Sequence, residues 1–179
     1  SEIRRQILTN AGVEFVSLAS PLVEELEKAK CENLSPPDLA KHLATAKAMA
    51  VALMHPADLV IGADQTLEFE GQVIHKAHSK RDAEATLNNL SGKQHLLHSA
   101  TAITKGRVLT FQHQSTATLT MRKLTPAFIS NYLDKIGDDA FISPGAYQIE
   151  KTGAQLFDQI SGDHFSILGL PLLPVLAFL

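Results

Sequence analysis

The 179-residue sequence has little cysteine, no excess of basic charge and no long apolar segment. Cys31 is the single cysteine, so no disulfide can form within the chain, and a reducing compartment is favoured. Lysine and arginine total 16 against 19 aspartates and glutamates, which gives a formal net charge of −3. This balance argues against a nucleic-acid partner, because no basic excess is available to neutralise phosphates.

The longest apolar run, Phe165–Leu179, is too short for a membrane span and contains Pro171 and Pro174. No charged-then-apolar segment opens the sequence, so we expect no signal peptide and no membrane partner. Hydrophobic residues make up 45% and charged residues 20%, proportions typical of a globular protein. We therefore expect a cytoplasmic protein with a single domain over residues 1–179.

Three common nucleotide and hydrolase motifs are absent. The sequence has no P-loop, no Gly-x-Gly-x-x-Gly and no Gly-x-Ser-x-Gly. Their absence argues against the usual NTPase, dinucleotide-binding and α/β-hydrolase machinery.

Helix and strand signals alternate along the chain, which predicts an α/β fold. Helices are expected at the start of the chain up to Gly12, from Ser35 to His55-Pro56, from Ser79 to Ser91-Gly92, from Thr125 to Gly137, and near Pro171. Strands are expected over residues 13–18, 59–63, 96–103, 108–121 and 146–160, with turns at Glu70-Gly71 and Lys105-Gly106.

The segment 59–63 is short and apolar on both faces, which predicts a central strand of a mostly parallel sheet. Asp64, Gln65 and Thr66 would then lie at its carboxyl end, where open α/β sheets bind ligands. An acid in this place can act as a general base or bind a divalent cation. The alternative is that Asp64 only caps the next turn.

Several polar and charged side chains are candidate ligands of a phosphate or a metal ion. Ser1 and Arg4 lie at a predicted helix start, which suits a phosphate, although a solvated helix end explains them equally well. Lys47 lies among alanines, which lets a long cation reach a ligand, but such a lysine is often only a surface residue. Glu24, Glu25 and Lys76 are uninformative by themselves.

Two histidine pairs, His75-x-x-His78 and His95-x-x-His98, have a spacing that could indicate a zinc-binding site. On a strand, residues three apart point to opposite faces, so the two histidines of either pair could not bind the same metal ion. We do not expect these histidines to bind a metal.

Taken together, these segments resemble the Maf family, also called septum formation inhibitor-like proteins. The resemblance runs in order along the whole chain, through Ser1-x-x-Arg4-Arg5-x-x-Leu8-x-x-x-Gly12-x-x-Phe15, Val23-Glu24-Glu25, Ala46-Lys47-Ala48, Val60–Thr66, His75-Lys76-Ala77, Leu90-Ser91-Gly92-x-x-His95, Gly145-Ala146-Tyr147 and Ile160–Leu172. Family members begin with an apolar strand before the serine that matches Ser1, and this strand is missing here. The chain is therefore either trimmed or one strand short.

The resemblance implies an elongated, twisted, mixed β-sheet flanked by helices, like that of Maf and inosine triphosphatase proteins. It also implies a nucleoside triphosphate pyrophosphatase, which yields a nucleoside monophosphate and pyrophosphate. Asp64 matches the family's proton acceptor, with Lys47 and Lys76 as further catalytic residues and Ser1 and Arg4 as phosphate ligands. Glu25 and Asp64 are the candidate ligands of a divalent cation, Mg²⁺ or Mn²⁺.

The positions that separate subfamilies correspond to Ile3, Gln65 and Glu150. Members that act on dTTP and UTP usually carry Arg, Thr and Gln there, and those that act on 7-methyl-GTP carry Trp, Gln and Glu. A carboxylate at Glu150 can accept hydrogen bonds from a guanine edge but repels the carbonyls of thymine and uracil. We expect a guanine-type base, with weaker selectivity for the methylated form because Ile3 cannot stack on it.

A different class of function stays open beside the enzyme, namely a nucleotide-binding regulator of cell division with little hydrolysis. Such a protein could dispense with Asp64 while keeping its cations. Because every charged candidate is present, the sequence favours the enzyme. The physiological metal and the assembly stay open, with a homodimer among the alternatives.

Overall fold

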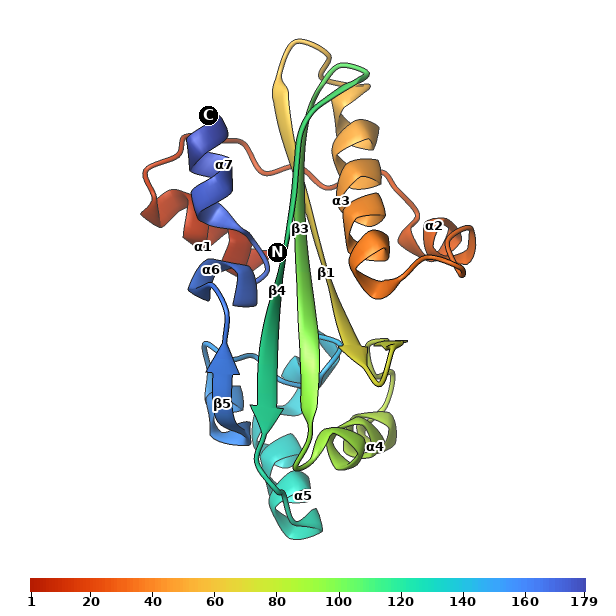
Figure 1. Cartoon of the computed structure of the whole chain (residues 1–179), viewed down its shortest axis with the longest axis vertical. Helices are drawn as coiled ribbons and strands as arrows, with labels where there is room; N and C mark the ends of the chain where they lie inside the picture. Colours follow the sequence, from red (N-terminus) through yellow and green to blue (C-terminus); the bar gives the residue numbers. More distant parts are fainter. The chain divides into compact units, whose positions relative to one another are not determined.

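The computed structural model of the chain describes residues 1–179 and contains seven α-helices, two 3₁₀ helices and five strands (Figure 1). The helices are α1 (Glu2–Asn10), α2 (Glu24–Ala29), α3 (Pro36–Ala52), α4 (Lys80–Leu90), α5 (Pro126–Ile136), α6 (His164–Ile167), α7 (Leu172–Phe178), η1 (Gly137–Phe141) and η2 (Thr152–Leu156). The strands are β1 (Leu59–Phe69), β2 (Gln72–Ile74), β3 (Gln94–Lys105), β4 (Val108–Met121) and β5 (Phe157–Ser161).

The chain divides into two compact units. The first contains residues 1–66, 98–116 and 163–179, and the second contains residues 67–97 and 117–162. Strands β1, β3 and β4 contribute residues to both units. The expectation of a single domain over residues 1–179 stays a prediction.

The five strands form one sheet in the order β2-β1-β3-β4-β5. In the first unit, β1 and β4 run in one direction and β3 in the other (Figure 1). In the second unit, β1 pairs antiparallel with β2, and β4 pairs antiparallel with β5. The α/β class with helices around one sheet is confirmed, but the expectation of a mostly parallel arrangement around β1 is wrong.

The apolar character of β1 has a different cause from parallel pairing. On one face, Gly62 meets α3, and on the other, Ala63 packs against a cluster of α1 and C-terminal residues. That cluster consists of Ile7, Leu8, Leu170 and Leu172, with Ile3 among its partly buried neighbours. Both faces of β1 are therefore covered by helices, which selects apolar residues whatever the strand direction.

Helix α3 lies unusually close to the sheet. Its alanines at positions 40, 44 and 48 pack against Ala100 and Ala102 of β3 and against Val60 of β1. A Cβ built on Gly62 would lie 2.3 Å from the Ala44 carbonyl oxygen and 2.7 Å from the Ala48 backbone nitrogen. Small residues on both partners are what permits this approach, and they bring the α3 side chains to the middle of β1.

Helix starts follow the predicted capping residues. Ser35 accepts a hydrogen bond from the Asp38 amide, Ser79 from the Asp82 amide and Thr125 from the Phe128 amide. Each satisfies an amide that the first turn leaves without a partner. The turns at Glu70-Gly71 and Lys105-Gly106 also lie where the sequence indicates, since both precede a returning strand.

Three element predictions need correction. Residues 13–18 form no strand: Val16 and Leu18 are exposed, and the segment joins no sheet. The predicted strand at 59–63 continues to Phe69, because its ladder extends to the pairing with β2. The predicted strand region 146–160 is a strand only from Phe157 onward, where β5 begins, and η2 precedes it.

The second unit has its own buried polar centre. His95 of β3 is buried, and its Nε2 lies 2.7 Å from the Tyr147 hydroxyl. Both rings contact Phe157 at the start of β5. Desolvation of the imidazole lowers the pKa of His95 to about 4, so the ring is neutral in the folded protein at physiological pH.

None of the helices combines the length and the hydrophobicity that a membrane crossing requires.

Candidate active site

The centre of the candidate site is Asp64, which belongs to the first unit and is only 6% exposed. It lies inside β1 and not, as predicted, at a carboxyl end, because the strand continues for five residues beyond it. Asp64 is two residues after Gly62 and so points to the same face of the strand, toward α3. The Lys47 Nζ of α3 donates to the Asp64 Oδ1 at 2.5 Å. The close approach at Gly62 thus places a cation against a buried acid.

Lys47 has a second carboxylate partner. Its Nζ lies 2.7 Å from the Glu24 Oε2 of α2, so one ammonium bridges two acids from different elements. The other oxygen of Glu24 pairs with Lys28 at 2.7 Å, one helical turn further along α2. The result is a chain of alternating charges: Lys28, Glu24, Lys47 and Asp64.

The two acids have opposite pKa shifts. Burial raises the pKa of Asp64 above its ordinary value, against the opposing charges of Lys47 and Arg4. Burial also acts to raise the pKa of Glu24, but hydrogen bonds from Lys28 and Lys47 outweigh it and lower that pKa to about 2. Asp64 is therefore the more basic carboxylate of the pair, and Glu24 keeps its charge over the physiological range.

Arg4 of α1 joins the same region through the backbone of β1. Its Nη1 donates to the Ala63 carbonyl at 3.0 Å and its Nε to the Gly169 carbonyl at 2.7 Å. Desolvation lowers the pKa of Arg4, and the negative charges of Asp64 and Glu24 oppose this. Gly169 has a φ of +95°, and a Cβ there would approach the guanidinium to 3.2 Å. A glycine at this position lets the arginine lie flat against the loop after α6.

The structure positions three further predicted residues of the first unit. Ser1 is the N-cap residue of α1 and is exposed at the start of the chain. Ile3 packs against the apolar cluster that covers β1. Gln65 points away from Asp64, and its Nε2 donates to the Ser99 hydroxyl at 2.8 Å and to the Ile167 carbonyl at 3.1 Å. Its amide therefore also ties β1 to α6.

The remaining predicted residues are not brought to Asp64 within the first unit. The side chain of Glu25 is 87% exposed and lies 3.9 Å from Lys28, so Glu24 occupies the place beside Lys47. Lys76 and Glu150 are exposed residues of the second unit. Their assigned roles stay predictions.

Sequence reasoning missed Glu24 and Lys28 as members of this charge chain. The short helix α2 was not predicted from the sequence. The i,i+4 spacing of the two residues, which indicates a contact only within a helix, was therefore not interpreted as an ion pair. One signal was available: Glu24 stands in the Val23-Glu24-Glu25 segment, where the resembled family usually carries an aspartate.

Comparison with known proteins gives a consistent result over the whole chain. A Nucleoside triphosphate pyrophosphatase of Bradyrhizobium diazoefficiens is 44% identical over 179 residues, covering 100% of this chain and 89% of that protein. A 7-methyl-GTP pyrophosphatase of Brucella abortus is 42% identical, covering 99% of this chain and 90% of that protein. The model of the Maf-like protein family matches residues 1–179. The chain therefore belongs to the Maf-like protein family.

Proposed function

We propose that the chain is a nucleoside triphosphate pyrophosphatase, which hydrolyses the bond between the α- and β-phosphates and releases a nucleoside monophosphate and pyrophosphate. The observation that carries the proposal is the buried Asp64, held against Lys47 inside β1. Two relatives at 42–44% identity, matched over about nine-tenths of their length, are named pyrophosphatases, which supports the same reaction class.

Asp64 is the proton acceptor in this proposal. Attack on a phosphorus atom needs a water molecule that loses a proton, and a carboxylate with a raised pKa accepts that proton more readily. In the resting protein the Lys47 ammonium, 2.5 Å away, opposes the effect of burial on the Asp64 carboxylate. When phosphate oxygens accept the hydrogen bonds of the Lys47 ammonium, the Asp64 carboxylate loses this partner and can accept the proton of the water molecule.

Arg4 and Lys47 supply positive charge for the triphosphate. Only two of the five N–H groups of the Arg4 guanidinium have carbonyl partners at Ala63 and Gly169, so the others suit phosphate oxygens. These cations would stabilise the charge that develops on the leaving pyrophosphate. Lys76 and Ser1 are assigned the same task from the family resemblance.

A divalent cation fits the donor set. Oxygens of Glu24 and Asp64 already converge on one cationic group, the Lys47 Nζ, at 2.7 and 2.5 Å. Carboxylate oxygens are the ligands that Mg²⁺ and Mn²⁺ prefer, and such an ion would neutralise part of the triphosphate charge. We propose Asp64 as one ligand, with Glu24 better placed than the originally predicted Glu25 as the other.

For the base, we propose a guanine-type nucleotide. Glu150 offers a carboxylate that suits the N1–H and amine of guanine, and one relative at 42% identity is named a 7-methyl-GTP pyrophosphatase. Ile3 gives apolar contact without stacking, so GTP and 7-methyl-GTP should differ less than they would beside an aromatic residue. The reaction is proposed to take place in the cytoplasm.

The test is pyrophosphate release from 7-methyl-GTP, GTP, dTTP and UTP, measured at steady state with Mg²⁺ and with Mn²⁺. The pyrophosphatase proposal expects release with a lead for the guanine nucleotides. Nucleotide binding without release would favour the regulator of cell division instead. A clear lead for dTTP or UTP would leave the reaction standing but overturn the proposed base.

A further inference from the structure

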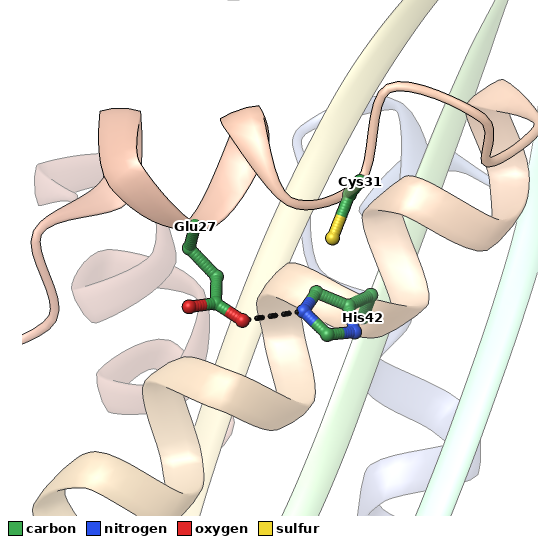
Figure 2. Close-up of side chains that lie close together, drawn as sticks. All are labelled: Glu27, Cys31 and His42. Atoms are coloured by element: carbon green, nitrogen blue, oxygen red, sulfur yellow. Dashed lines mark hydrogen bonds and ion pairs between the residues drawn. The ribbon is translucent and has the colours of Figure 1, made fainter.

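Beside the charge chain, α2 and α3 bring together three different metal-binding donors. Glu27 lies on α2, Cys31 follows in the turn after it, and His42 lies on α3 (Figure 2). One donor atom from each of the three lies within 4.8 Å of the other two. None of these residues belongs to the proposed pyrophosphatase machinery.

We propose that Glu27, Cys31 and His42 form a binding site for a transition-metal ion of the zinc class, separate from the divalent cation of the pyrophosphatase reaction. A thiolate, an imidazole and a carboxylate are three ligand types that zinc accepts, whereas Mg²⁺ avoids sulfur. With three protein ligands, a water molecule would complete a tetrahedral site.

The distances allow the site to close with side-chain movement alone. Zinc bonds of about 2.0–2.3 Å place tetrahedral ligand atoms roughly 3.3–3.8 Å apart. The His42 Nε2 and Glu27 Oε1 are now 2.7 Å apart, so this pair opens by roughly half an ångström to admit the ion. The Cys31 thiol points toward the His42 ring, and it has to approach by no more than roughly 1.5 Å (Figure 2).

The surroundings suit a metal that enters from solvent. Cys31 is buried, the Glu27 side chain is 15% exposed, and the His42 side chain is 40% exposed, so the imidazole forms the open side of the site. The second oxygen of Glu27 is held by Lys30 at 2.8 Å, which orients the carboxylate as an outer partner does in metal sites.

Binding balances both charge and protons. The ion displaces the proton of the Cys31 thiol, which leaves to solvent. The Nε2 hydrogen that His42 directs at the Glu27 carboxylate also leaves that nitrogen, and the single ring proton is then carried by Nδ1, so that the Nε2 lone pair binds the ion. A divalent ion with the thiolate and the Glu27 carboxylate is then neutral overall. The site would fasten α2 to α3, the helices that carry Glu24 and Lys47, and so limit how far this pair can separate.

The first test measures metal binding by the reduced full-length chain, without nucleotide and with excess Mg²⁺ to occupy oxygen-only sites. Zn²⁺ is titrated against a chromogenic chelator, and Co²⁺ binding is followed by its thiolate charge-transfer band. We expect one equivalent of either ion, the Co²⁺ band, and a melting temperature that rises by roughly 5–10 °C at Zn²⁺ about 100-fold above its Kd. A chain that neither competes for Zn²⁺ nor gives the Co²⁺ band overturns the proposal.

Variants assign the ligands. Cys31→Ser should remove the charge-transfer band, and His42→Gln should weaken Zn²⁺ binding by about 100-fold or more, since even the loss of an outer partner costs about 10- to 100-fold. His55→Gln is the matched control, because His55 is a partly exposed histidine that pairs only with Asp58. His42 is partly exposed, so its variant keeps the test valid if Cys31→Ser does not fold. Unchanged Zn²⁺ affinity in His42→Gln would reduce the cluster to an ion pair beside a buried thiol.

Discussion

Two aspartates near β1 have different environments, which makes them suitable for a paired mutational test. Asp64 is buried against Lys47, whereas the side chain of Asp58, just before the strand, is 70% exposed. Asp64→Asn keeps the shape of the side chain but cannot accept a proton. We expect turnover to fall by about 10²–10⁴-fold while nucleotide binding persists.

Asp58→Asn is the control for this variant and should turn over nucleotide like the parent. The measurement is steady-state pyrophosphate release together with direct nucleotide binding. Near-parental turnover in Asp64→Asn would remove the residue from its proposed role.

Neighbouring glutamates on α2 allow a second residue-level test. Glu24 pairs with both Lys47 and Lys28, whereas Glu25 is exposed to solvent. If Glu24 is the second metal ligand, Glu24→Gln should raise the Mg²⁺ concentration needed for half-maximal turnover by at least about 10-fold. Glu25→Gln should raise it less. The reverse order would restore the original assignment of Glu25 as a ligand.

At the scale of elements, the site depends on how closely α3 approaches β1. Gly62→Ala would place a methyl group 2.3 Å from the Ala44 carbonyl oxygen. We expect a loss of about 1–3 kcal/mol in the free energy of unfolding, as overpacked cores show, and lower turnover because Lys47 moves away from Asp64. Urea unfolding and pyrophosphate release measure the two effects.

The same substitution in an Ala48→Gly background is an internal control. Ala48→Gly removes the Cβ that lies 2.9 Å from the added methyl group, but the backbone atoms of Ala44 and Ala48 remain in place. Gly62→Ala should therefore cost a similar amount in either background. Full rescue by Ala48→Gly would show that the helix backbone does not restrict this approach.

Elements with local signals were predictable from the sequence. Ser35, Ser79 and Thr125 each start a helix because their side chains satisfy a first-turn amide, which depends only on neighbours in the chain. The end of β1 and the direction of its neighbours depend on partners distant in sequence, so neither could be predicted from its own residues. Helix α2 has six residues and no side-chain cap, so its local signal is weak: acidic residues in the first turn and Lys28 in the last.

At the scale of the whole molecule, His95 makes stability depend on pH. Its folded pKa of about 4 lies below the ordinary value of 6.5, so the unfolded chain binds more protons between these two values. The contribution is complete above pH 6.5 and is lost as the pH falls toward 4. By pH 5 the free energy of unfolding should drop by roughly 2 kcal/mol from this residue alone.

Comparing urea unfolding at pH 7 and pH 5 tests this. His95→Gln should lose less stability between the two pH values than the parent, whatever its stability at pH 7. His78→Gln replaces an exposed histidine and should follow the parent. An equal pH dependence in His95→Gln would show that other groups dominate the acid response.

Three of the residues predicted for the candidate site lie together in the structure, but the contacts among them were not predictable. Asp64, Lys47 and Arg4 were identified from their sequence motifs, and the structure brings all three together in the first unit. That Lys47 bridges Asp64 and Glu24 could not be predicted, because the bridge depends on the glycine contact between β1 and α3. The hydrogen bond from the Gln65 amide to α6 likewise depends on a carbonyl distant in sequence.

The bridge formed by Lys47 has a consequence for the resting protein. Because the Lys47 ammonium lies against Asp64 inside the strand, the buried carboxylate has a counter-ion even without the proposed metal ion. Many metalloproteins lose stability without their ion. Here, withholding Mg²⁺ and Mn²⁺ should abolish turnover but leave the urea midpoint unchanged, so that the metal arrives with the nucleotide at a site that is already folded.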